Sequence, residues 1–161
     1  MIINTDAIVL KTFSYGETSL ISRCFTKDKG KISFIIKGAK SKKNLVSPYF
    51  QPLSFINIIY KENEKRELQI VSKVSFVQIW TQISLSLRKM SLSQSILEIS
   101  DFTLEKNDPY PDLFSILIKT FQSKPFLYIS TTIVFKVFNN FIICLWCYKL
   151  QSFKKFFVKC I

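Results

Sequence analysis

Residues 28–43 read Asp-Lys-Gly-Lys-Ile-Ser-Phe-Ile-Ile-Lys-Gly-Ala-Lys-Ser-Lys-Lys, and the rest of the chain is best understood as a scaffold for this stretch. A turn at 28–30 leads into an apolar strand, 32–36, which opens into a loop of small residues and lysines. Small residues let a phosphate backbone approach closely, and lysines supply mobile positive charge. The pattern is typical of a nucleic-acid contact loop, and a solvated basic loop without a ligand is the open alternative.

The composition favours a folded protein with a polyanionic partner. The chain has 161 residues, of which 48% are hydrophobic, enough for one domain or two small ones with a real core. Its formal charge is +12, from 23 Lys and Arg against 11 Asp and Glu. Such an excess indicates nucleic acid first and an acidic membrane surface second.

The residue types present argue against catalysis. The chain contains no histidine, which excludes histidine-based acid–base and triad chemistry. It also shows no phosphate-cradling glycine motif and no clear pair of carboxylates, so we expect no enzyme. Cys144 and Cys147 have CxxC spacing, but no second pair follows, and we expect core thiols on a helix rather than a zinc or redox site. With no secretory signal apparent, a cytosolic, reduced protein is expected.

Five segments have the composition and alternation of β-strands: 5–12, 19–26, 32–36, 53–60 and 68–77. The first is apolar at four consecutive positions, which predicts a strand that is buried on both faces or curves into a barrel. The last is expected to place Leu68, Ile70, Ser72, Val74 and Phe76 on one face. Five short strands with one long loop after the third predict a five-stranded OB-fold barrel, and periodicity does not separate it from an SH3-like barrel.

The hydrophobic period becomes helical from Trp80 onward. Ile83, Leu87, Met90, Leu97 and Leu104 form one stripe, residues 107–111 interrupt it, and further helices are expected at 112–122 and at about 125–148. The apolar segment 126–150 is interrupted by Lys136, which favours a buried helix over a membrane span. The fold class is therefore α+β, with an OB-fold domain at 1–79 and an incomplete all-α helical domain at 80–161, packed tightly together.

Several short fragments of the first half of the chain belong together. They are the heptapeptide Asp-Ala-Ile-Val-Leu-Lys-Thr at 6–12, Tyr-Gly-Glu at 15–17, Phe-Thr at 25–26, Gly-Lys at 30–31, Lys-Gly-Ala-Lys at 37–40, Gln-Pro-Leu at 51–53 and Arg-Glu-Leu at 66–68. Together they resemble the start of one bacterial family, the DNA repair protein RecO. Each fragment is short, and their order and spacing over about 70 residues make the resemblance specific. Tyr-Lys-Leu at 148–150 is similar to a later family segment.

The resemblance implies an OB-fold followed by a helical domain that carries a zinc-binding cysteine cluster in many members. It implies binding to single- and double-stranded DNA, annealing of complementary strands, and recombinase loading together with RecR. It further implies that the helical domain takes up the acidic C-terminal tail of the single-stranded-DNA-binding protein. This chain stops at Cys160-Ile161, about where the first zinc cysteine would stand, so we expect a truncated or frame-damaged copy. We expect no cofactor here, and zinc only in a longer form.

Strand annealing requires no catalytic residue, because lysines that neutralise phosphates lower the repulsion between two strands. The candidates for phosphate contact are Lys37, Lys40, Lys42 and Lys43, with Arg23 and Lys11 in support. Tyr15 and Tyr49 are candidates for stacking on bases, with packing at the barrel edge as the alternative. The predicted function is a DNA repair and recombination mediator in the cytoplasm, associated with the nucleoid and not with a membrane. The alternatives are an RNA-binding barrel of the translation machinery, a peripheral membrane protein and a non-functional remnant.

Overall fold

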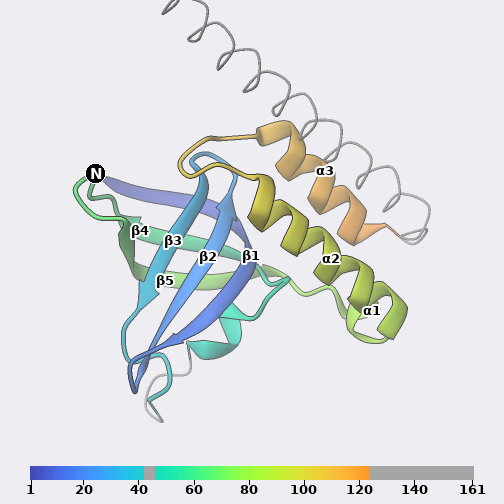
Figure 1. Ribbon diagram of the computed structural model, residues 1–161, viewed down its shortest axis with the longest axis horizontal. Helices are drawn as coiled ribbons and strands as arrows, with labels where there is room; N and C mark the ends of the chain where they lie inside the picture. The colour runs from blue at the N-terminus through green and yellow to red at the C-terminus, as the bar shows by residue number, and fades with distance from the viewer. Residues whose placement is uncertain (42–45, 124–161) are drawn as a thin grey trace, which may run out of the picture.

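The structure, a computed structural model, describes residues 1–41 and 46–123. Five strands form a closed barrel in the order β1-β2-β3-β5-β4, and three helices lie against one side of it (Figure 1). The strands are β1 (Ile2–Tyr15), β2 (Ser19–Thr26), β3 (Gly30–Ile36), β4 (Phe55–Lys61) and β5 (Leu68–Gln78). A short 3₁₀ helix, η1 (Ser47–Phe50), precedes β4, and α1 (Thr81–Ser84), α2 (Leu87–Thr103) and α3 (Pro111–Gln122) follow β5. The predicted five-stranded OB-fold barrel followed by helices is confirmed.

Residues 7–10 of β1 are buried on both faces, as their continuous apolar run predicts. Ala7 and Val9 belong to the core inside the barrel, whereas Ile8 and Leu10 belong to a second core that the helices share. Phe25 of β2 joins this second core and meets Phe114 of α3 edge to face, with ring centroids 5.4 Å apart. The barrel and the helices are thus joined by one continuous apolar cluster, and the expected tight packing is observed.

The prediction that Leu68, Ile70 and Ser72 share one face of β5 with Val74 is wrong. Ile59 of β4 pairs with Lys73 and Tyr60 pairs with Val71, so Ser72 is an extra residue in β5. Such a β-bulge reverses the alternation of side chains along a strand. Val71 and Val74 therefore both pack against the barrel core, and the buried residue at the start of the strand is Gln69 rather than Leu68.

The predicted helical stripe is also interrupted. Ser86 separates α1 from α2 and accepts a hydrogen bond from the Lys89 backbone N–H, so it begins α2 as an N-cap. This break resets the helical phase, and Leu87 and Met90, predicted to point inward, are 86% and 43% exposed. The later positions Leu97 and Leu104 are buried as predicted.

The predicted helix at 125–148, with Cys144 and Cys147, lies outside the described residues, as does the apolar segment 126–150. Within the described part of the chain, no helix combines the length and the apolar character needed to cross a membrane.

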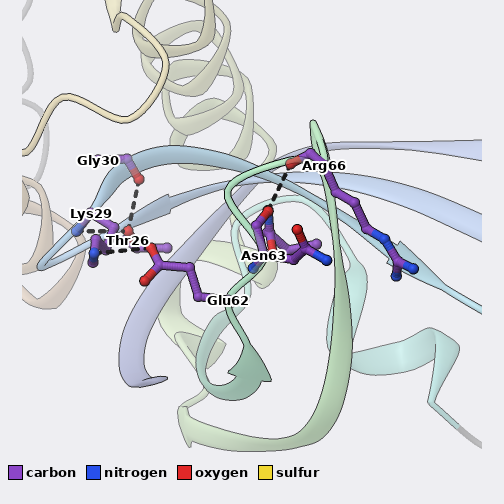
Figure 2. Close-up of polar contacts among 7 residues, drawn as sticks. Thr26, Lys29, Gly30, Glu62, Asn63 and Arg66 are labelled. Atoms are coloured by element: carbon purple, nitrogen blue, oxygen red, sulfur yellow. Dashed lines mark hydrogen bonds and ion pairs between the residues drawn. The ribbon is translucent and has the colours of Figure 1, made fainter. Parts of the chain in front are cut away.

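Side-chain hydrogen bonds fix the two turns at the end of the barrel where β3 begins (Figure 2). The Thr26 hydroxyl donates to the Gly30 carbonyl at 2.8 Å and accepts from the Lys29 N–H at 3.2 Å. Lys29 then reaches the β4–β5 turn, where its Nζ lies 2.9 Å from Glu62. Gln69 closes that turn by donating to the carbonyls of Asn63 and Arg66. This end of the barrel is therefore rigidly tied, and its charges are partly paired.

Candidate nucleic-acid interface

A second β-bulge decides which side chains of β1 reach the surface. Val9 pairs with Cys24 of β2 and Lys11 pairs with Arg23, so Leu10 is the extra residue. After the bulge, Lys11, Phe13 and Tyr15 alternate outward, because cross-strand partners share a face and Arg23 points away from the barrel core. We call this surface the outer face, and its members are Lys11, Phe13, Tyr15, Ile21, Arg23, Ser33 and Ile35.

An exposed aromatic ring beside two cations is the main feature of the outer face. Phe13 is 40% exposed. Lys11 Nζ lies 5.5 Å from the centroid of its ring and Arg23 Cζ lies 5.0 Å from it. Both distances are within the range of cation–π attraction. The arrangement offers a flat surface for a base directly beside positive charge for a phosphate.

Phe13 was not among the residues predicted from the sequence. Strict alternation along β1 does not reveal it, because the bulge at Leu10 changes the phase. Its position between Lys11 and Tyr15 at spacing two was the available signal. Tyr15 itself is 53% exposed at the end of β1, where it is accessible to a ligand.

Arg23 also has a structural role that the sequence did not indicate. Its Nη2 lies 3.0 Å from Asp101 Oδ2 of α2, an ion pair whose side chains are 33% and 12% exposed. Lys31 of β3 donates to the main-chain carbonyl of the same Asp101 at 2.6 Å. Burial lowers the pKa of Lys31, the charges of Arg23 and Lys106 add to this effect, and Asp101 opposes it. Arg23 and Lys31 of the barrel therefore both bind Asp101 near the C-terminal end of α2, where the free carbonyl groups of the helix favour positive charge.

We call the segment that follows β3 and carries Lys37, Lys40, Lys42 and Lys43 the lysine loop. Its described residues lie at the end of the barrel where β1 turns into β2. Lys37 and Lys40 are exposed, and the backbone N–H of Lys40 donates to the Thr18 carbonyl at 2.9 Å. This bond ties the loop to the β1–β2 turn that follows Tyr15. Lys42 and Lys43 lie outside the described residues, and their role stays a prediction.

Tyr49 is placed differently from Tyr15. It is half-buried in η1 and stacks on Phe76 of β5, with ring centroids 4.4 Å apart and an angle of 28° between the planes. The packing at the barrel edge that the sequence left open is thus observed. Tyr49 and Lys37 line a separate groove between β3 and β5.

Two observations concern metal binding and the one cysteine in the described part of the chain. No cluster of three or more Cys, Asp or Glu side chains is arranged around a common point in residues 1–41 and 46–123. Burial raises the pKa of the Cys24 thiol to about 12, and the Ser22 hydroxyl opposes this only in part. Because the thiolate is the reactive form, Cys24 is a core thiol.

Comparison with known proteins connects this barrel to one family. Residues 1–80, which include all five strands, match the family described as "Recombination protein O N terminal". The chain belongs to the RecO family. The resemblance drawn from the short fragments of the sequence is thereby confirmed.

The curated relatives extend the similarity into the helices. The DNA repair protein RecO of Salinibacter ruber is 32% identical over 118 residues, which is 73% of this chain and 45% of the relative. The protein of the same name from Chlorobium luteolum is 28% identical over 120 residues, 74% of this chain and 46% of the relative. That from Alkaliphilus metalliredigens is 29% identical over 120 residues, again 74% of this chain, and 48% of the relative. The chain spans about half the length of the curated relatives that it matches.

The ion pair between Arg23 and Asp101 allows a first test of whether the outer face of this RecO-family barrel binds nucleic acid. Asp101→Asn removes a negative charge next to Arg23, so we expect binding to a single-stranded oligonucleotide to become a few-fold tighter at low salt. We also expect a loss of about 1–3 kcal/mol in the free energy of unfolding, because a charge-assisted bond at a mostly buried site is lost. Fluorescence anisotropy and urea unfolding measure the two effects. Weaker binding at unchanged fold would show that Asp101 orients Arg23 for the ligand instead of neutralising it.

Proposed function

We propose that this chain is the DNA-binding part of a DNA repair and recombination mediator. Its relatives are named DNA repair protein RecO. We assign the DNA contact that such a role requires to the outer face of this barrel. The observation that carries it is the exposed Phe13 ring with Lys11 and Arg23 beside it, on a face that continues to Tyr15 and the loop of Lys37 and Lys40. An OB-fold uses a face of its barrel and the loops beside it to bind oligonucleotides.

The mechanism that we propose is non-catalytic. Lys11, Lys37 and Lys40 neutralise phosphates and release condensed counterions, which supplies affinity without sequence preference. Phe13 and Tyr15 stack on unpaired bases, and aromatic stacking tolerates any base. With its charge neutralised, a bound strand repels its complement less, so annealing is accelerated. Duplex DNA binds through the phosphate contacts alone.

The proposed role also involves partner proteins. In keeping with the family resemblance, we propose that the complete protein acts with RecR and with the tail of the single-stranded-DNA-binding protein to load the recombinase. A cytoplasmic, nucleoid-associated location follows from such a role. The net charge of +12 supports the DNA contact, and it does not bear on these protein partners.

The test is binding measured across a salt series. We expect the affinity of the chain for a fluorescent single-stranded DNA to fall steeply between about 50 and 200 mM salt, with little dependence on base sequence. Duplex DNA is expected to bind with a similar salt dependence. Competition with a structured RNA hairpin separates this function from an RNA-binding role in translation. Affinity that stays flat over the series, or a strong preference for the hairpin, would contradict the proposal.

A further inference from the structure

A groove opens where the barrel closes. β3 and β5 run parallel and pair only at Ser33–Leu68, Phe34–Gln69 and Ile35–Ile70. Beyond these pairs β3 ends at Ile36 and β5 contains the bulge at Ser72, so the two strands separate. The space between them is about 550 Å³, and its lining includes Ile36, Lys37, Val46, Tyr49, Ser72 and Lys73. Ligand pockets in proteins usually measure about 300–1,000 Å³.

The groove combines positive charge with an aromatic wall, which suits a ligand made of an anionic group attached to a flat ring. Lys37 follows β3 and Lys73 lies on β5, so a cation is contributed from each of the two strands. Both lysines are exposed, and neither forms an ion pair with any residue of the described chain. The groove lining contains no carboxylate among the residues that the structure describes. Charge complementarity therefore favours an anionic occupant.

Tyr49 gives the groove a rigid aromatic wall. One side of its ring is stacked on Phe76, which restricts the ring before any ligand arrives. Ile36 and Val46 add aliphatic side chains to the lining of the groove. A wall that is already ordered loses little side-chain entropy when a ligand binds.

We propose that this groove holds one unpaired nucleotide of a DNA strand, with the base against Tyr49 and the flanking phosphates near Lys37 and Lys73. The inference rests on the proposed function, and it adds a reason for preferring single strands to duplex. A base in a duplex is stacked on both sides and paired at its edge, so it enters a pocket only after it has been unstacked. Ile35, which pairs with Ile70 of the groove lining, belongs to the outer face, so a strand that lies on the outer face continues into the groove.

The test compares three ligands of equal length: a thymidine strand of about ten nucleotides, the same phosphate backbone without bases, and a duplex. Tyr49→Leu is expected to weaken binding of the thymidine strand about tenfold and to leave the other two within twofold. Lys73→Ala is expected to weaken binding of both single strands, with or without bases, about fivefold. The control is Lys65→Ala, which removes the same charge from an exposed position in the β4–β5 turn and is expected to have a smaller effect on every ligand.

The fold of each variant is checked by circular dichroism and thermal unfolding. Because Tyr49 packs on Phe76, a second variant is needed if Tyr49→Leu does not fold. Ser72→Trp fills the groove from an exposed position of β5, and we expect the same selective loss for the base-bearing strand. If the folded Tyr49→Leu or Ser72→Trp variant loses no affinity, or loses affinity for base-bearing and abasic strands alike, the groove inference is overturned and the proposed function stands. The inference is also overturned if Lys73→Ala weakens binding no more than Lys65→Ala does. If the wild-type chain binds none of the ligands, both fail.

Discussion

Replacing Gly30 by alanine is expected to lower the free energy of unfolding by about 2–5 kcal/mol. Gly30 is buried at the start of β3, directly after the β2–β3 turn, and has a φ of +68°, a conformation that residues other than glycine rarely adopt. A Cβ at this position would overlap the backbone carbonyl of Asp108, in the loop between α2 and α3. Two backbone segments must then separate, so the loop is expected to lose its hydrogen bond from Asn107 N–H to the Lys31 carbonyl. For a chain of this size the loss corresponds to a drop in Tm of roughly 4–20 °C.

Gly16→Ala is the matched control for that variant. Gly16 has a φ of +58° in the β1–β2 turn, but a Cβ there has no atom within 4 Å. Its cost is therefore only the conformational strain of about 1–2 kcal/mol. Chemical unfolding of both variants separates the two contributions. Equal losses would show that strain alone limits Gly30 and that the contact with Asp108 contributes nothing.

Changing Lys11, Lys37 and Lys40 together to alanine is expected to weaken single-stranded DNA binding about fiftyfold at about 0.15 M salt. Each phosphate contact with a single strand contributes about 0.7 to the slope of log affinity against log salt concentration. Three lost contacts therefore reduce the magnitude of the slope by about 2. All three side chains are exposed, so we expect the Tm to remain near that of the wild type. Anisotropy titrations at several salt concentrations measure both the affinity and the slope.

A second triple variant controls for total charge. Lys27, Lys61 and Lys65 are exposed and lie in or next to the two turns at the opposite end of the barrel. Their replacement removes the same three charges from the chain, but no contact that we assign to DNA. A similar change in slope for both triple variants would mean that overall charge, and not the outer face, attracts the strand. A separate change of Lys42 and Lys43 tests the remaining part of the lysine loop.

Most of the barrel was predictable because its signals are local. The apolar run at 7–10 predicted a strand buried on both faces, and the structure divides those four side chains between two cores. The turn at 28–30 and the alternation in β2 and β3 were read correctly for the same reason. In each case the pattern depends on residues that are close together in the chain.

The errors come from features that distant residues decide. Bulges at Leu10 and Ser72 reverse the facing of β1 and β5, and they become visible only when the partner strands are known. They explain why Phe13 was missed and why Leu68 was given the face that Gln69 occupies. Arg23 was predicted to support phosphate binding, and its neighbour Asp101 is 78 positions away along the chain (101 − 23 = 78). Long-range charge pairs of this kind leave no periodic signal in a sequence.

The short parallel pairing of β3 with β5 also has a dynamic consequence. The barrel is closed there by three residue pairs, whereas β1 and β2 are joined by eight. Regions with few backbone hydrogen bonds open at lower free energy than the rest of a protein. We therefore expect local opening to separate β3 from β5 first, while the other strand pairs of the barrel stay hydrogen-bonded. Because this parallel pair borders the groove between β3 and β5, its opening would change the shape of the groove and limit how long a nucleotide stays bound there.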